Sequence, residues 1–249
     1  MAIYGWTVHL GGFFLLLGRA LVAGVSSPPR RKVFLDQLYE VGVRSLSIVN
    51  LTAIFTGMVM ALQLGYFLAQ FGAKMFVGRV VGLAIISELG PVLTALMIGG
   101  RVGAGMAAEL GTMKVTEQVD ALRALGTDPI AYLVVPRLFA VIVMLPLLTA
   151  LADMIGVLGG MMVASGELSV PAAFYGRSLL QFLTIGDLMR SLAKSVVFAV
   201  IIGGVACYNG LNTRGGADGV GRATTRTVVV ASITVLISDF FLTKLMMPL

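Results

Sequence analysis

The stretch SLSIVNLTAIFTGMVMALQLGYFLAQF, residues 45–71, contains no charged residue over 27 positions. A helix needs about 20 mainly apolar residues to cross the hydrocarbon core of a bilayer, so this stretch can span it with some tilt. Four further stretches have the same character and carry at most two charges each: 80–100, 138–166, 195–213 and 227–247. The sequence therefore predicts five membrane-spanning helices.

The composition of the whole chain agrees with this pattern. Of the 249 residues, 58% are apolar and 12% are charged, against roughly 25% charged in a typical soluble domain. The mean hydropathy is +0.97. These values exclude a soluble enzyme, a disordered chain and a disulfide-rich secreted domain. We expect an all-α, polytopic membrane protein.

The first 25 residues are apolar but less regular. Arg19 interrupts an apolar run that extends from Ile3 to Gly18. No basic segment precedes this run, so we do not expect a cleaved signal peptide. Because 16 apolar residues are few for a full span, we expect a helix that enters one leaflet rather than a sixth span. We thus predict a single domain over 1–249, with inserted and interfacial helices in 1–44 and a five-span core in 45–249.

The basic residues predict the orientation of the spans. Residues 26–44, 112–137 and 212–226 together hold ten Lys and Arg, against about six on the other side. Short loops rich in Lys and Arg stay in the cytoplasm, so these three stretches are expected there, with the C-terminus outside. The net charge of +6 then marks topology and does not call for a nucleic-acid partner.

The chain lacks the residues that common catalytic and metal sites need. Cys207 and His9 are the only residues of their types, which excludes an internal disulfide and a Cys- or His-based metal site. No GxxxxGK[ST] run is present to bind ATP, and a single histidine cannot supply the two that HExxH needs. We therefore expect no catalytic residue, cofactor or metal, and no hydrophilic stretch is long enough for a separate soluble domain. Any domain that hydrolyses ATP must belong to another chain.

Several charged residues fall inside or at the ends of the predicted spans. A carboxylate at such depth costs about 2.5–3.5 kcal/mol on insertion scales, so it should face protein or water. Three interpretations remain open: a proton relay, a polar wall of a substrate cavity, and ion pairs that lock helices together. We favour ion pairs, because no chain of closely spaced acids is visible. The residues concerned are Glu88, Arg101, Glu109, Asp153 and Asp239.

Small residues recur at every fourth position of the second span, at Gly99, Gly103, Ala107 and Gly111. On a helix they form one smooth stripe that another backbone can approach closely. Packing within one subunit and a contact between two subunits are equally compatible with the stripe.

The loop TMKVTEQVDALRALGTDPIAYLVVP, residues 112–136, contains a short amphipathic pattern. Val115, Val119, Leu122 and Leu125 share one helical face, and Gly126 is a natural end for the helix. A helix resting on lipid headgroups and a docking helix for a partner protein both fit. We favour docking, because the other face mixes acids with bases, whereas a lipid-facing helix would favour Lys and Arg there.

The run SELGPVLTALMIGGRVGAGMAAELGTMKVTEQVDALRALGTDP, residues 87–129, resembles the signature stretch of MlaE/YrbE-type lipid ABC transporter permeases. The runs GMVMALQ at 57–63, KSVVFAV at 194–200 and GVGRATTRTVV at 219–229 are also similar, as is YNG at 208–210. The resemblance extends from about residue 35 to the C-terminus. Ser87 is a departure, because the family often has Arg at this position, and a pairing role for that Arg does not transfer to this chain.

The resemblance implies a homodimer in a bacterial inner membrane that moves phospholipids between the inner and outer membranes. It also implies two copies of an ATPase subunit, an MCE-domain protein on the periplasmic side and a STAS-domain protein. The helix near 115–125 would be the coupling helix that fits the ATPase. Its residues are Val115, Glu117, Val119, Asp120, Leu122, Arg123 and Leu125.

The resemblance further implies a lipid cavity lined by the first span together with the fifth. A wide apolar wall suits acyl chains, and a few polar groups can orient a headgroup. The matching positions are Met60, Gln63, Phe67, Leu68 and Phe71. Two other functions stay open: an ion-coupled secondary transporter or channel, which would use the buried acids, and a membrane scaffold without a substrate.

Overall fold

The computed structural model describes residues 2–26 and 31–246, and the side chains of 11–24 and 31–246. Arg30, one of the basic residues counted in the stretch 26–44, and the side chain of His9 lie outside this part. The described residues form helices and turns, without a strand. The N-terminal helices are α1 (Ala2–Ser26), α2 (Arg31–Val41), η1 (Val43–Ser45) and α3 (Leu46–Gln70). They are followed by η2 (Lys74–Phe76), α4 (Val77–Ala84), η3 (Ile85–Leu89), α5 (Gly90–Ile98), η4 (Gly99–Gly103) and α6 (Ala104–Val115). The remaining helices are α7 (Gln118–Ala124), η5 (Ile130–Val134), α8 (Val135–Gly166), α9 (Ala172–Phe182), α10 (Ile185–Leu211) and α11 (Gly216–Met246).

The prediction of five spanning helices is confirmed. Five described segments are long and apolar enough to cross a membrane: Arg31–Gln70, Lys74–Val115, Ile130–Gly166, Ile185–Leu211 and Gly216–Met246. The apolar part of α1 whose side chains are described, Gly11–Gly24, is shorter than a span. The protein is thus an all-α, multi-pass membrane protein.

The chain divides into two compact units. The first comprises Met1–Arg44, Ile98–Met144 and Val197–Ser238, and the second comprises Ser45–Met97, Leu145–Val196 and Asp239–Leu249.

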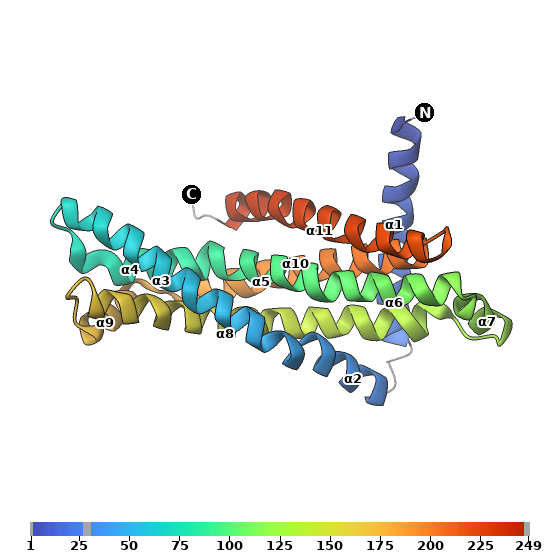
Figure 1. Ribbon diagram of the computed structural model, residues 1–249, viewed down its shortest axis with the longest axis horizontal. Coiled ribbons are helices and arrows are strands. Elements are labelled where there is room, and N and C mark those ends of the chain that lie inside the picture. The colour runs from blue at the N-terminus through green and yellow to red at the C-terminus, as the bar shows by residue number, and fades with distance from the viewer. Residues whose placement is uncertain (1, 27–30, 247–249) are drawn as a thin grey trace. The chain divides into compact units, whose positions relative to one another are not determined.

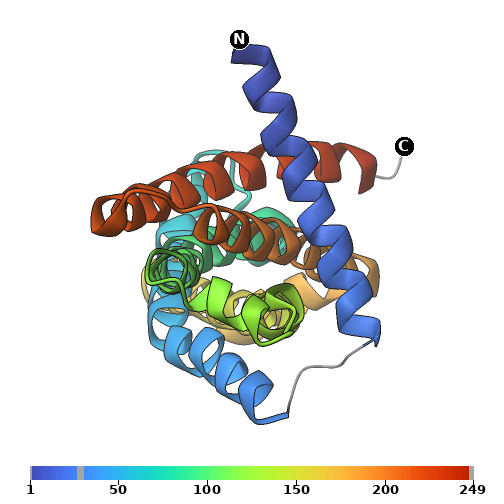
Figure 2. The ribbon, with the colours of Figure 1, turned by 90° about the vertical axis from the view of Figure 1, so that its right-hand side faces the viewer.

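The first unit has a core built around α1, α6, η5 and α10. Leu16, Leu17 and Ala20 of α1 pack there against Leu138 and Cys207. Helix α1, dark blue in Figures 1 and 2, passes close to η5. Apolar side chains along one face of α1 therefore bind it to this unit.

The second unit has a separate core in which α4 packs between α3 and α9. Ala61 of α3, Val81 of α4 and Tyr175 of α9 are fully buried in it. Glycines let the helices come close, since a Cβ at Gly57 of α3 would collide with the carbonyl oxygen of Gly156 of α8. Packing of this kind, between small residues, is the usual way in which membrane helices associate.

Single π-helical turns lie inside the second spanning segment, at η3 and η4, and at the start of the third, at η5. The first of them directly precedes Gly90 and Pro91. Proline has no amide hydrogen to continue the ladder, so a local change of hydrogen bonding is expected here. Such turns often occur at functional sites.

The predicted amphipathic helix at 115–125 differs from the structure. Val115 is the last residue of α6, and Glu117 adopts a left-handed conformation with φ of 62°. That conformation ends the first helix, so α7 starts afresh at Gln118 and ends at Ala124. Residues 115–125 therefore form a helix–turn–helix corner rather than one continuous helix.

Candidate functional site

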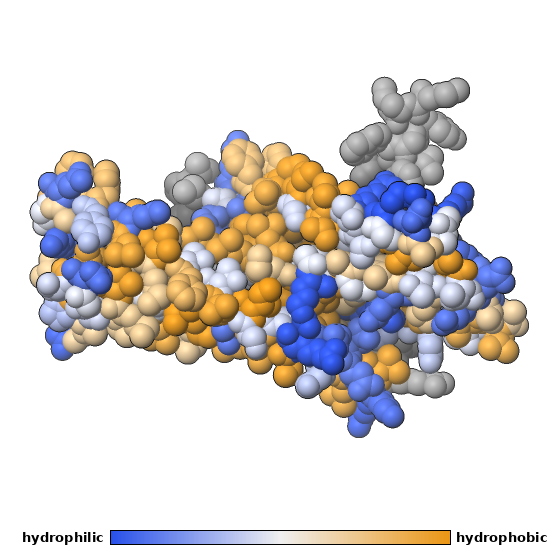
Figure 3. Space-filling view, in the orientation of Figure 1, coloured by the Kyte–Doolittle hydropathy of each residue, from blue (hydrophilic) through white to orange (hydrophobic). Residues whose placement is uncertain are grey.

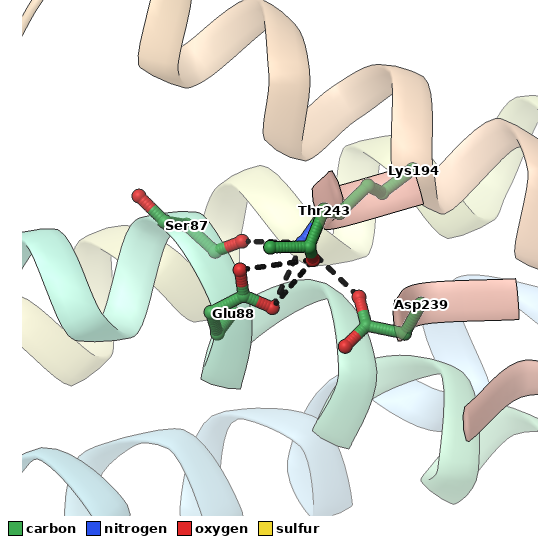
Figure 4. A network of polar contacts seen from close by, with 5 residues as sticks. All are labelled: Ser87, Glu88, Lys194, Asp239 and Thr243. Carbon is green, nitrogen blue, oxygen red and sulfur yellow. Dashed lines mark hydrogen bonds and ion pairs between the residues drawn. The ribbon is translucent and has the colours of Figure 1, made fainter. Parts of the chain in front are cut away.

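Lys194 lies at the centre of a polar network in the second unit (Figure 4). Its ammonium nitrogen lies 2.8 Å from Glu88 Oε2 and 3.1 Å from Asp239 Oδ1. It also donates to the hydroxyl of Thr243 at 2.7 Å and to the main-chain carbonyl of Ser87 at 3.0 Å. Thr243 in turn donates to Glu88 Oε1 at 3.1 Å. One lysine thus joins η3, α10 and α11.

The backbone near Glu88 explains why a cation suits this position. In a regular α-helix the carbonyl of Ser87 would accept a hydrogen bond from the amide of residue 91, but residue 91 is proline. Lys194 supplies a donor to this carbonyl instead. Its side chain is only 3% exposed, and a buried charge needs partners of this kind.

The network matches the ion-pair interpretation of Glu88 and Asp239. The sequence predicted neither Lys194 nor Thr243 as a partner of these carboxylates. The sequence separation of 106 residues between Glu88 and Lys194 explains this, because no local pattern links them.

Arg101 and Glu109 form separate ion pairs in the first unit. A guanidinium nitrogen of Arg101 lies 3.9 Å from a carboxylate oxygen of Glu40, and one of Arg137 lies 3.1 Å from Glu109. Sequence reasoning had not identified Glu40 and Arg137 as the partners.

Asp153 departs from the ion-pair expectation. Its side chain accepts a hydrogen bond from the hydroxyl of Ser191 at 3.1 Å, and the residue is 4% exposed. Among the residues that the structure describes, no cation pairs with Asp153. The residue packs against Gly90, where a Cβ would collide with its carboxylate.

The residues of the expected coupling helix lie on two sides of α7. Val119 is fully buried and Leu122 packs partly against the core of the first unit, whereas Leu125, just beyond α7, is 80% exposed. Asp120 is held by Lys114 at 2.7 Å and by Arg123 at 3.0 Å. The hydrogen bond from Lys114 lowers the pKa of the Asp120 carboxyl below its usual range. This corner therefore presents a charged surface with one protruding leucine.

The residues expected to line a cavity divide along α3. Gln63, Phe67 and Phe71 follow one another at intervals of four and all are exposed. The rings of Phe67 and Phe71 meet edge to face, with centroids 5.1 Å apart. Met60 and Leu68 are half-buried and pack against the core of the second unit. The outward face of α3 thus presents the aromatic rings of Phe67 and Phe71 and the side-chain amide of Gln63.

The small-residue stripe is packed within this chain. A Cβ at Gly103 would lie 3.3 Å from Ile202, and one at Gly111 would lie 2.9 Å from the hydroxyl of Thr213. Ala107, between them, is fully buried. The structure therefore supports packing within one subunit for this stripe.

Comparison with known proteins shows consistent similarity along most of the chain. A family described as Permease MlaE matches residues 34–245. A probable ABC transporter permease protein of Rickettsia typhi is 44% identical over 236 residues, which cover 94% of this chain and 91% of that protein. One from Synechocystis is 43% identical over 241 residues, covering 97% and 92%. The intermembrane phospholipid transport system permease protein MlaE of Haemophilus influenzae is 37% identical over 242 residues, covering 94% and 93%.

Proposed function

The chain belongs to the MlaE family of ABC transporter permeases, and from this premise we propose that it moves phospholipids between the inner and outer membranes of a bacterium. The observation that carries the proposal is the outward face of α3. Phe67 and Phe71 are 56% and 69% exposed there and would contact acyl chains. Gln63, one turn away, would hydrogen-bond to a headgroup.

The cavity would form between two copies of the chain. Among the five described spans, the fifth and the first have the smallest buried shares. Helix α11 exposes Val229, Ile233 and Ile237 at intervals of four residues, each at least 50%. A homodimer that brings these faces together would enclose an apolar path for lipid.

Energy would come from an ATPase on a separate chain. An ABC permease implies such a partner, and the corner formed by α6 and α7 is the surface that we assign to its docking. The shape of this corner supports the assignment, because it presents the charged side chains of Asp120 and Arg123 beside the exposed Leu125. Two ATPase copies would dock on a homodimer, one on each corner.

The remaining partners and the location rest on the family alone. We propose that an MCE-domain protein binds on the periplasmic side, that a STAS-domain protein joins the ATPases, and that the permease itself has no catalytic role. The Haemophilus influenzae relative is by name part of an intermembrane phospholipid transport system. This favours a bacterial inner membrane.

An ion-coupled transporter has weaker support. Such a transporter would use the carboxylates of Glu88, Asp153 and Asp239 to carry the ion. Lys194 binds two of these three carboxylates, those of Glu88 and Asp239. Ion pairs of this kind are better suited to holding helices together than to passing protons.

The proposal can be tested with the co-purified permease and ATPase in proteoliposomes. ATP-dependent movement of a fluorescent phospholipid supports it. Movement driven by a proton or sodium gradient without ATP would support the ion-coupled alternative, and a purified complex without bound phospholipid by mass spectrometry would support a scaffold.

A further inference from the structure

A hollow of about 430 Å³ lies beside the polar network of Lys194, within the second unit. Its walls come from η3, from the first turns of α10 and from the end of α11. This volume is in the range of small-molecule sites. The hollow shares no residue with the outward face of α3, so it is a second candidate site.

Two carboxylates and two cations line the hollow, so the charges of its lining balance. They form two ion pairs, in each of which one member is more exposed than the other. Glu88 is 41% exposed and its partner Lys194 only 3%, whereas Arg190 is 39% exposed and its partner Asp187 15%. A ligand in the hollow would therefore meet one carboxylate, that of Glu88, and one guanidinium, that of Arg190.

Both of these exposed groups have hydrogen-bonding capacity left for a ligand. The oxygens of Glu88 accept from Lys194 and Thr243, but a carboxylate offers about four acceptor sites. Glu88 also shares the charge of Lys194 with Asp239, which lies on the other side of the ammonium nitrogen (Figure 4). One nitrogen of Arg190 lies 3.4 Å from Asp187, and a guanidinium has five N–H donors.

The hollow lies near one boundary of the hydrocarbon core. The apolar stretch 195–213 begins directly after Lys194, and the stretch 227–247 ends directly after Met246. Both points belong to the side on which we expect the C-terminus. In the second unit, Figure 3 shows hydrophobic residues (orange) along α3 and hydrophilic residues (blue) near the end at which α3 meets η2 and α4. The hollow is thus at a depth that lipid headgroups can reach.

We propose that this hollow binds the phosphoethanolamine headgroup of a phospholipid. Glu88 would accept hydrogen bonds from the primary ammonium group, and Arg190 would donate to the phosphate, which suits the planar fork of a guanidinium. A quaternary ammonium group, as in phosphatidylcholine, has no N–H to donate and is usually held by aromatic rings. Among the described residues, none that lines the hollow is aromatic.

This inference rests on the proposed function and deepens it, because the ligand belongs to the class of lipid that we propose is transported. It adds the class of headgroup that the permease selects. Lys194 and Asp187 would hold the two binding groups in position from behind. The ion pairs then both join the helices and present one charge of each sign to the lipid.

The test uses the full complex in nanodiscs with equal amounts of phosphatidylethanolamine, phosphatidylcholine and phosphatidylglycerol. A photo-crosslinking amino acid replaces Met246, which lines the hollow, or Leu245, which is 82% exposed and does not. Mass spectrometry of the intact protein should find phosphatidylethanolamine at position 246 about tenfold more often than phosphatidylcholine, the effect of one charge-assisted hydrogen bond. At position 245 the three lipids should be captured equally.

Variants assign the two roles. Glu88→Gln should remove the preference for phosphatidylethanolamine at position 246, because a neutral amide attracts the ammonium group less. Arg190→Gln should lower the capture of all three lipids there about tenfold. The matched control Arg177→Gln, at an exposed position of α9 outside the hollow, should change neither result. The comparison among lipids needs neither variant, so it tests the site even where a variant fails to fold.

Three results would overturn the site: equal capture of the three lipids at position 246, stronger capture of phosphatidylglycerol there, or a preference that Glu88→Gln leaves unchanged. Displacement of the lipid by millimolar phosphoethanolamine would show a free amine as the occupant and would also contradict a lipid site. ATP-dependent lipid transfer separates the two proposals. Transfer without a preference at position 246 would count against this site alone, and selective capture without transfer would count against the proposed function alone.

Discussion

The ammonium group of Lys194 donates to the carbonyl oxygen of Ser87 at 3.0 Å, the carbonyl whose α-helical donor is removed by Pro91. The same ammonium group binds two carboxylates, Glu88 and Asp239. A proline in the second span is thus compensated by a lysine from the fourth, which also holds the end of the fifth.

We expect Lys194→Met to destabilise the protein strongly. Lys194 is 3% exposed, and its removal leaves Glu88 and Asp239 without their counterion. Because Glu88 is 41% exposed, the cost should lie below the about 3–5 kcal/mol of a fully buried pair. The thermal unfolding midpoint in detergent should fall by roughly 5 °C. The control Lys244→Met, at an exposed position of α11, should change little.

Glu88→Gln should cost less than Lys194→Met, since Asp239 still pairs with the lysine. If Lys194→Met and Lys244→Met had equal midpoints, the network would not hold the helices together.

Gly103→Leu should destabilise the first unit, whereas Gly100→Leu should not. A side chain at Gly103 meets Ile202 at 3.3 Å and Thr227 at 3.8 Å, but nothing lies within 4 Å of a Cβ at Gly100. Overpacking typically costs about 1–3 kcal/mol. Both unfolding midpoints can be compared in one detergent, and a larger loss for Gly100→Leu would contradict the packing described here.

Leu125→Asp should weaken ATPase docking without unfolding the chain. This side chain is 80% exposed, so a charge there costs the isolated permease little, while burial of a leucine side chain at an interface contributes about 1.5–3 kcal/mol. A pull-down with the ATPase should show at least a roughly tenfold loss of affinity.

The matched control for docking is Leu180→Asp, a 73% exposed leucine of α9 in the second unit. Equal docking by both variants would place the ATPase contact elsewhere. Val119 is unsuitable for this test, because it is buried in the core of the first unit.

Photo-crosslinkers at Gln63 and Phe67 should capture phospholipid in an ATP-dependent manner. Both side chains are exposed on α3, and turnover should empty and refill the cavity. Val196 on the fourth span is also exposed and serves as a control for contact with bulk lipid, which ATP should not change. Captured phospholipid can be quantified by mass spectrometry, and ATP-independent capture at all three positions would contradict the cavity.

The five spans could be predicted from sequence, because the length and hydropathy of a segment are local properties. Gln63 and Phe67 were singled out by the family resemblance alone, because a span without charged residues has no polar face that would mark one side of the helix.

Long-range pairing could not be predicted. Thr243 and Glu88 are 155 residues apart, and nothing near either residue indicates the other. The break at Glu117 also escaped prediction, since a left-handed glutamate has no reliable sequence signal. Asp153 was expected to pair with a cation but binds Ser191, because burial and packing against Gly90 decide its partner.

We propose above that this permease moves phospholipid with energy from a separate ATPase. The most direct measurement is transfer of a fluorescent phospholipid out of proteoliposomes that hold the co-purified complex, with and without ATP. We predict transfer that requires ATP, that Leu125→Asp lowers markedly and that Leu180→Asp preserves. Transfer that proceeds without ATP under an ion gradient, or no transfer by a complex that hydrolyses ATP, would contradict the account.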